Sequence, residues 1–234
     1  KAKLLEVAID VNKGRIPLMY GIGGNDTAEV IQRIGNTNFK AVDALLSVCP
    51  YYNKPSQAGV IEHYKAIAAK SPVPVLAYNV PGRTGINMSA NTSIRLSEVV
   101  NIFGVKEASG DLVQALEIIK NTPKEFLVIS GDDLLAVPTI SIGAVGAISV
   151  LSNTYPEKFS EMIKAAIQSR FQHATETLIT FTEINPLMYE EGNPVGVKAL
   201  LQHLGICLNE VRLPLVKASE GLQERIIEAH KKIA

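Results

Sequence analysis

Residues 102–106 read Ile102-Phe103-Gly104-Val105-Lys106, a short β-branched and aromatic run that ends in a lysine. The run shows little polar alternation, which is typical of a parallel strand that is buried on both faces by crossover helices. Asp111 follows in the position of an N-cap, directly before an amphipathic stretch. The segment therefore predicts a strand, a loop and a helix, with a lysine at the C-terminal end of the strand.

The same unit recurs along the chain. Asp26, Ser56 and Ser89 are further N-cap candidates before amphipathic runs. Six strand candidates alternate with these helices: Ile16 to Tyr20, Val42 to Val48, Val73 to Tyr78, Ile102 to Lys106, Phe126 to Ser130 and Gly146 to Leu151. The repeat predicts an α/β protein with a parallel sheet, which is either an open doubly wound sheet or most of a (β/α)8 barrel.

Two details favour the barrel. No glycine-rich phosphate-binding fingerprint follows the first strand, and polar candidates follow the C-terminal ends of several strands, where barrel active sites lie. Lys1 to Val11 has helical spacing without a preceding cap, so we expect the chain to begin inside a helix. We therefore expect a TIM barrel that is N-terminally incomplete, with six of its eight strands present.

The pattern changes to helices alone after the sixth strand. We expect a barrel portion over residues 1–169 and a C-terminal helical domain over residues 170–234. Asn193-Pro194 is interpreted as a cap with proline at the first helical position, and Leu213-Pro214 as a break. The expected helices are about Pro156 to Ser169, Arg170 to Tyr189, Pro194 to Leu204 and Lys217 to Lys232.

Composition excludes several classes of function. Lys plus Arg equal Asp plus Glu at 23 each among 234 residues, so no basic surface indicates a nucleic-acid partner or an anionic membrane. The two cysteines, Cys49 and Cys207, have no CxxC or histidine-rich spacing that would indicate a disulfide framework or a metal site. The apolar runs are too short to span a bilayer. We expect a soluble cytoplasmic protein without a metal or an organic cofactor.

Three side chains could perform carbonyl chemistry. Burial at the top of the sheet would disfavour the charged form of Lys106 and leave a neutral amine that can attack a carbonyl. Tyr78 ends the preceding strand and could transfer protons, while Arg83 in the next loop could bind a carboxylate with two donors. By position alone, Lys106 is more often a surface lysine, and Pro81-Gly82 more often a simple turn. Paired tyrosines in a loop, such as Tyr51-Tyr52, are often subunit-interface residues.

The motifs together resemble the dihydrodipicolinate synthase family, in the same order and at matching spacing over essentially the whole chain. The residues that carry the resemblance are Tyr78-Asn79-Val80-Pro81-Gly82-Arg83-Thr84-Gly85, Gly104-Val105-Lys106-Glu107-Ala108-Ser109-Gly110, Pro50-Tyr51-Tyr52-Asn53, Ser130-Gly131-Asp132-Asp133 and Ala147-Ile148-Ser149-Val150. The resemblance implies a (β/α)8 barrel with a C-terminal helical extension, and a homotetramer built as a dimer of dimers. It implies condensation of pyruvate with L-aspartate-4-semialdehyde to 4-hydroxy-tetrahydrodipicolinate, in lysine (diaminopimelate) biosynthesis.

The resemblance also implies a role for individual residues. Lys106 would form the Schiff base with pyruvate, Tyr78 would relay protons, and Tyr52 would enter the active site of the partner subunit. Arg83 would bind the carboxylate of the semialdehyde. Gly131 and Ile148 would line the pyruvate pocket. Asn25, Glu29 and Tyr51 match positions of an allosteric lysine site, although Asn25 and Glu29 equally suit a glycine-rich turn and an exposed first helical turn.

One family motif, Gly-Thr-Thr-Gly-Glu, has no counterpart here, because Lys1 to Val11 matches the helix that follows it. We therefore expect the first two βα units to be missing. Two other interpretations stay open. An N-acetylneuraminate lyase or keto-sugar-acid aldolase would share Lys106 and Tyr78, but these enzymes generally lack an arginine at the position of Arg83. A catalytically silent truncated chain or interaction protein would retain the fold without the reaction.

Overall fold

The computed structural model describes residues 2–233, which form two compact units. One unit ends at Ile129 and the other begins at Ser130. The division expected from the sequence, after residue 169, separates barrel units from the helices that follow and stays a prediction.

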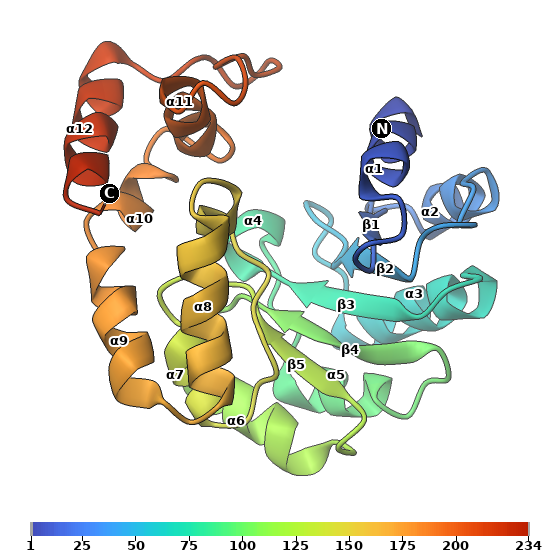
Figure 1. The fold of residues 1–234 in the computed structure, drawn as a ribbon. Helices are drawn as coiled ribbons and strands as arrows, with labels where there is room; N and C mark the ends of the chain where they lie inside the picture. The colour runs from blue at the N-terminus through green and yellow to red at the C-terminus, as the bar shows by residue number, and fades with distance from the viewer. Residues whose placement is uncertain (1, 234) are drawn as a thin grey trace. The chain divides into compact units, whose positions relative to one another are not determined.

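The first unit is built on a parallel sheet (Figure 1). Its strands follow one another in the sheet in the order β1-β2-β3-β4-β5. A doubly wound sheet reverses its strand order at a switch point, whereas a barrel wall keeps the order of the chain. The order therefore settles the choice that the sequence left open, in favour of the barrel. The strands are β1 (Met19–Gly21), β2 (Ala44–Val48), β3 (Val75–Asn79), β4 (Ile102–Glu107) and β5 (Leu127–Ser130).

The helices of this unit begin where the sequence predicts. The side chains of Asp26, Ser56, Ser89 and Asp111 each accept hydrogen bonds from backbone N–H groups of the first helical turn, which confirms all four N-caps. Lys1, which belongs to the expected N-terminal helix, lies outside the described residues. The helices are α1 (Ala2–Asn12), α2 (Thr27–Gly35), α3 (Gln57–Lys70), α4 (Pro81–Thr84), α5 (Ala90–Leu96) and α6 (Leu112–Asn121).

The helices pack against one another in chain order and cover the sheet. Helix α2 contacts α3, α3 contacts α5, and α5 contacts α6. Burying one aliphatic side chain in this way contributes about 1.5–3 kcal/mol. One buried cluster between the sheet and its helices consists of Ile22, Val30, Ile34, Leu45, Ile67 and Val75.

Strand β4 carries an irregularity that decides which face each side chain occupies. Val75 pairs with Ile102, but the next residue of β3, Leu76, pairs with Gly104, so Phe103 is an extra residue. A Cβ atom on Gly104 would lie 2.2 Å from the carbonyl oxygen of Leu127 in β5. Only glycine allows the two backbones to approach this closely.

In the second unit, the sixth expected strand is reduced to an isolated bridge between Ser130 and Ala147. The N–H of Ser130 donates to the carbonyl of Gly146, and the N–H of Ile148 donates to the carbonyl of Ser130, both at 2.9 Å. The pairing goes no further because the buried carboxylate of Asp133 accepts the next backbone N–H groups. These groups belong to Val150 and Leu151, at 3.1–3.2 Å. The turn η1 (Leu151–Asn153) then follows.

Helices make up the remainder of the second unit, with two departures from expectation. The segment from Arg170 to Tyr189 is not one helix, because α9 ends at Thr180 and a separate short helix, containing Pro186, follows it. Pro194 is the N-cap residue of α11, not its first helical residue. The helices are α7 (Ala136–Ser141), α8 (Pro156–Ile167), α9 (Phe171–Thr180), α10 (Ile184–Leu187), α11 (Val195–His203) and α12 (Glu220–Lys231). In the described part of the chain, none of the helices has the length and apolar character needed to cross a bilayer.

Candidate active site

Lys106 and Tyr78 lie side by side at the C-terminal ends of neighbouring strands. The register of β3 and β4 pairs Tyr78 with Lys106, and the Nζ atom of Lys106 lies 4.2 Å from the centroid of the Tyr78 ring. Lys106 is only 9% exposed. An amine over an aromatic face and out of bulk water is partly desolvated. The structure thus brings together the two side chains on which the sequence prediction depends.

The environment of Tyr78 keeps its phenol protonated. Burial raises the pKa of Tyr78 above its ordinary value of 10.0, and the positive charge of Arg83 opposes that rise. At neutral pH the hydroxyl is therefore a proton donor, which is the form needed to protonate an oxygen that leaves a carbinolamine.

Arg83 is placed by the short helix α4 that follows β3. The helix spans Pro81–Thr84 and is capped at its C-terminus by Gly85, which adopts the left-handed conformation with a φ of 75°. The Arg83 side chain is exposed and forms no ion pair within the described residues. It is available to a carboxylate that arrives from solvent.

The loop after β2 is anchored to the ends of β3 and α4. The N–H of Cys49 donates to the carbonyl of Tyr78 at 2.9 Å, and the N–H of Tyr52 donates to the carbonyl of Thr84 at 3.2 Å. Tyr52 has a φ of 71°, and its side chain is 87% exposed. Its backbone is thus fixed beside the candidate site while its ring points away from the packed core of its own unit.

Cys49 is inert in this setting. Burial raises the pKa of its thiol to about 12, and the nearby negative charge of Glu107 adds to the rise. The thiol is therefore protonated and a poor nucleophile at neutral pH. The buried Tyr64 hydroxyl lies 3.7 Å from the sulfur, donates to the Ser47 carbonyl at 2.8 Å and accepts from the Tyr78 N–H at 3.2 Å.

The pyruvate-pocket candidates Gly131 and Ile148 belong to the second unit. The bridge at Ser130 places them next to each other, since the N–H of Ile148 donates to Ser130, the residue before Gly131. Asp133 holds the following segment through the N–H groups of Val150 and Leu151. Burial raises the pKa of the Asp133 carboxyl, while a hydrogen bond from Ser149 opposes the rise.

The candidate allosteric residues cluster around the start of α2. The side-chain amide of Asn53 donates to the carbonyl of Asn25 at 3.0 Å, which joins the tyrosine loop to this turn. Glu29 in the first turn of α2 is exposed and lies 3.6 Å from Arg33. Tyr51 is 41% exposed.

Sequence reasoning missed a buried polar network behind the Lys106–Tyr78 pair. The carboxylate of Glu107 accepts hydrogen bonds from Asn79, Ser109 and Gln114. A signal was present, because each of two apolar strands ends in a candidate residue followed at once by a polar one: Tyr78 by Asn79, and Lys106 by Glu107.

Comparisons with known proteins identify the family of this chain. A sequence model described as the Dihydrodipicolinate synthetase family matches residues 1–233. The 4-hydroxy-tetrahydrodipicolinate synthase of Cytophaga hutchinsonii is 83% identical over 233 residues, which are 100% of this chain and 78% of that protein.

Two crystal structures extend the agreement to the fold. The chloride-inhibited dihydrodipicolinate synthase from Acinetobacter baumannii, complexed with pyruvate, is 37% identical with a TM-score of 0.95, over 99% of this chain and 80% of that one. The enzyme from Cyanidioschyzon merolae with lysine bound is 35% identical with a TM-score of 0.89, over 93% of this chain and 74% of that one. This chain therefore belongs to the Dihydrodipicolinate synthetase family.

Proposed function

We propose that this chain is a Schiff-base lyase that condenses pyruvate with L-aspartate-4-semialdehyde and yields 4-hydroxy-tetrahydrodipicolinate, in lysine (diaminopimelate) biosynthesis. The observation that carries the proposal is the buried Lys106 amine, 4.2 Å from the centre of the Tyr78 ring. The name of the close Cytophaga relative and the pyruvate in the Acinetobacter enzyme support the same reaction.

The chemistry runs through one covalent intermediate on Lys106. The amine adds to the pyruvate carbonyl, and the carbinolamine loses water to give an imine, with Tyr78 supplying the proton that the leaving oxygen needs. Loss of a proton from the pyruvate methyl group gives an enamine, whose carbon attacks the aldehyde. Ring closure by the amino group of the second substrate then expels Lys106. The iminium nitrogen of Lys106 is the electron sink. Gly131 and Ile148 line the pyruvate pocket in this proposal.

Trapping the imine tests the proposal. The protein is incubated with pyruvate, reduced with borohydride, and the modified peptide is mapped by mass spectrometry. We expect a stable adduct on Lys106 in the wild type and in Lys120→Ala, an exposed-lysine control on α6, and none in Lys106→Ala. Well-folded wild type without an adduct would assign the chain to the catalytically silent class.

Arg83 distinguishes the synthase from a sugar-acid lyase. A guanidinium at the end of α4 suits the carboxylate of aspartate semialdehyde, and its exposure leaves it accessible. We expect Arg83→Gln to raise the KM for the semialdehyde while pyruvate is still trapped on Lys106. Cleavage of N-acetylneuraminate by the wild type would favour the alternative lyase instead.

Tyr52 supports a dimer that shares its active sites, within a dimer-of-dimers tetramer. Its exposed ring on a backbone held beside the site suits insertion into a second copy. Neither Tyr52→Ala nor Lys106→Ala alone would then be active. Mixing the two variants should restore one working site per hybrid dimer, which contains Lys106 from one subunit and Tyr52 from the other. Failure of mixing to restore turnover, with hybrids shown to form, would remove Tyr52 from the relay.

We further propose that lysine inhibits the enzyme at Asn25, Glu29 and Tyr51, and that the enzyme is cytoplasmic. The hydrogen bond from Asn53 to the Asn25 carbonyl holds the loop that carries Tyr51 next to the turn before α2. The structure of the Cyanidioschyzon relative has lysine bound. Turnover measured against added L-lysine should fall in the wild type. Glu29→Gln, which removes a carboxylate for the lysine ammonium, should weaken that inhibition; no inhibition of the wild type would exclude the site.

A further inference from the structure

A cluster of buried polar side chains lies on the face of β3 and β4 opposite to the Lys106–Tyr78 pair. Side chains alternate between the faces of a strand, and the register pairs Tyr78 with Lys106 and Asn79 with Glu107. Asn79 is fully buried and Glu107 is 6% exposed. Each of the two reactive side chains therefore has a buried polar neighbour behind it.

The Glu107 carboxylate is held by neutral N–H donors from three segments. Oε1 accepts from the Ser109 N–H at 2.6 Å and from Asn79 Nδ2 at 3.1 Å. Oε2 accepts from the same Asn79 nitrogen and from Gln114 Nε2 on α6, both at 3.0 Å. The carboxylate thus joins the end of β4 to β3, to the loop after β4 and to α6.

Asn79 extends the network to the segment that follows α4, the short helix on which Arg83 lies. Its Oδ1 accepts from the Met88 N–H at 2.9 Å, and its Nδ2 also donates to Asn87 Oδ1 at 2.8 Å. Asn87 in turn donates to Gln114 Oε1 at 2.8 Å. One hydrogen-bonded network therefore fixes the segments that leave both strand ends.

The network matters because the strand register is vulnerable here. Phe103 is an extra residue in β4, only three positions before Lys106. A slip of one residue would exchange the faces of Lys106 and Glu107, since the side-chain period of a strand is two. The carboxylate–amide contact between Glu107 and Asn79 fits only the observed register.

We propose that Glu107, acting through Asn79 and Gln114, is a positioning residue for the Lys106 amine against Tyr78. The proposal rests on the proposed function, because it assumes that Lys106 is the nucleophile. It goes beyond it in assigning a role to a carboxylate on the far face of the sheet, which substrate does not contact.

Glu107→Gln is the decisive variant. Both carboxylate oxygens accept from two donors, so either orientation of a glutamine amide places its NH2 group against N–H groups. We expect the rate of pyruvate trapping on Lys106 to fall about 10- to 100-fold, because small displacements of a reacting group have effects of this size. The kcat for the condensation should fall, with little change in the KM for the semialdehyde.

A second readout needs no substrate. Competitive labelling with a small amine reagent gives the reactivity of Lys106 relative to the exposed Lys120 in the same molecule. In Glu107→Gln, we expect this ratio to move toward one, because the end of β4 loses its fixed place. If wild type takes no pyruvate, the proposed function fails, but the ratio still tests the positioning of Lys106.

Asn101→Asp is the matched control for lost stability. Asn101 lies directly before β4, at the N-terminal ends of β3 and β4, whereas Glu107 lies at their C-terminal ends. The Nδ2 atom of Asn101 donates to the carbonyls of Ala68, Ser71 and Val73 at 3.0–3.2 Å. The change is also isosteric and also removes hydrogen bonds. We expect it to lower the unfolding midpoint, while the trapping rate per folded molecule and the labelling ratio stay at wild-type values.

Further variants keep the proposal open to contradiction. In Asn79→Asp/Glu107→Gln, the carboxylate and the amide exchange places, and part of the lost trapping rate should return. If Glu107→Gln does not fold, Gln114→Leu decides, because it removes one donor to Glu107 and should slow trapping several-fold. Wild-type trapping and an unchanged ratio in folded Glu107→Gln or Gln114→Leu would overturn the proposal. The proposal would also be overturned if Asn101→Asp lowered the trapping rate per folded molecule as much as Glu107→Gln.

Discussion

Two buried polar side chains of the first unit contrast with the solvent-exposed polar contacts at the start of α12 in the second. In the first, Glu107 and His63 are 6% and 4% exposed, and their partners are uncharged. In the second, the polar contacts that join α12 to the segment before α11 involve charged side chains in solvent, such as Arg225 and Glu190, 51% and 44% exposed. Burial decides what each contact contributes, since exposed pairs are screened and buried polar groups are costly to leave without a partner.

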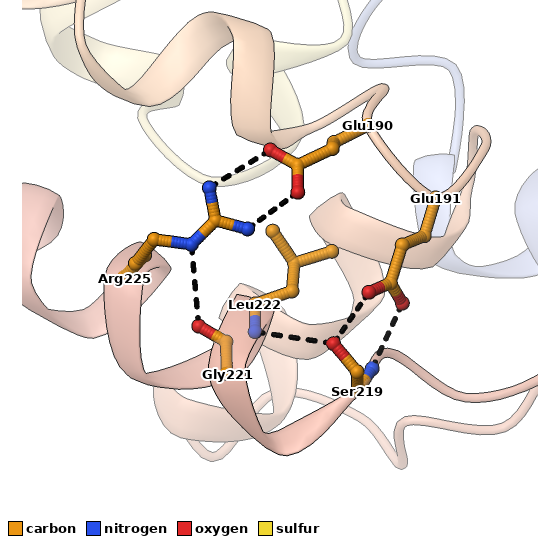
Figure 2. Close-up of polar contacts among 6 residues, drawn as sticks. All are labelled: Glu190, Glu191, Ser219, Gly221, Leu222 and Arg225. Carbon is orange, nitrogen blue, oxygen red and sulfur yellow. Dashed lines mark hydrogen bonds and ion pairs between the residues drawn. The ribbon is translucent and has the colours of Figure 1, made fainter.

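Figure 2 shows the solvent-exposed arrangement. The two guanidinium nitrogens of Arg225 each contact one carboxylate oxygen of Glu190. Glu191 accepts hydrogen bonds from the backbone N–H and the hydroxyl of Ser219, the N-cap residue of α12. These bonds lower the pKa of the Glu191 carboxyl. The contacts orient the start of a helix and do not lie in a packed core.

The largest effect is expected on turnover, for a substitution at Tyr78. Tyr78→Phe keeps the ring beside Lys106 but removes the phenolic proton, so turnover should fall about 100-fold or more. The free energy of unfolding should change little. Tyr155→Phe is the control from the second unit, where the hydroxyl bonds to His230 at 2.9 Å, and its turnover should stay at the wild-type level. Equal turnover of the two variants would remove Tyr78 from the proton relay.

A large effect on stability is expected at Gly104. An alanine there would place its Cβ 2.2 Å from the Leu127 carbonyl oxygen, and forced overpacking of this kind costs about 1–3 kcal/mol. Gly21 in β1 is the matched control, because no atom lies within 4 Å of its would-be Cβ. Urea unfolding should show a clear loss for Gly104→Ala and little change for Gly21→Ala. Similar losses would mean that the close approach of β4 and β5 is not rigid.

The buried histidine predicts a pH effect of intermediate size. Burial lowers the pKa of His63 from 6.5 to about 4, and its Nδ1 lies 2.8 Å from the Thr27 hydroxyl. Between pH 6.5 and about pH 4, His63 is protonated in the unfolded chain but neutral in the native chain. The free energy of unfolding therefore falls as the pH falls through this range. At pH 5 the loss from this group amounts to about 2 kcal/mol relative to pH 7.

His63→Gln isolates that contribution, because glutamine keeps an acceptor for Thr27 but does not titrate. The carboxylates contribute equally to both proteins, so the difference in unfolding free energy between variant and wild type should change between pH 7 and pH 5. A difference that is constant with pH would show that His63 takes up its proton in the native state as readily as in the unfolded state.

Much of the first unit could be predicted because its local signals agree with its tertiary structure. N-cap residues at Asp26, Ser56, Ser89 and Asp111 and apolar runs between them define βα units without reference to distant contacts. A lysine and a tyrosine at the ends of successive strands must then lie at the same edge of a parallel sheet.

The parts that could not be predicted depend on distant partners. The sixth strand is cut short by Asp133, a carboxylate 17 residues from the Val150 N–H that it accepts. The extra residue Phe103 is a property of pairing with β3 and leaves no periodicity in the sequence. The Glu107 network needs Gln114 from a separate helix. The pattern of a single sequence indicates the spacing of residues within one helix or strand. The Asp133 contacts, the extra residue Phe103 and the Glu107 network depend instead on contacts between different elements.

The smallest effect is expected at the exposed pair of Arg225 and Glu190. Hydrogen bonds from Arg225 lower the pKa of the Glu190 carboxyl, yet solvent and salt screen such exposed pairs, so they contribute little to stability. We therefore expect a cycle of Arg225→Gln and Glu190→Gln to give a small coupling energy, and a smaller one at high salt.

The same cycle on Asn79→Ala and Glu107→Ala should give a larger coupling energy that is insensitive to salt, because both side chains are buried. Both pairs have two hydrogen bonds between the partners, and the exposed pair also joins opposite charges, so a larger coupling energy for the buried pair would reflect its removal from water. If the exposed pair coupled as strongly as the buried one, the geometry of the contact and not its removal from water would determine its strength.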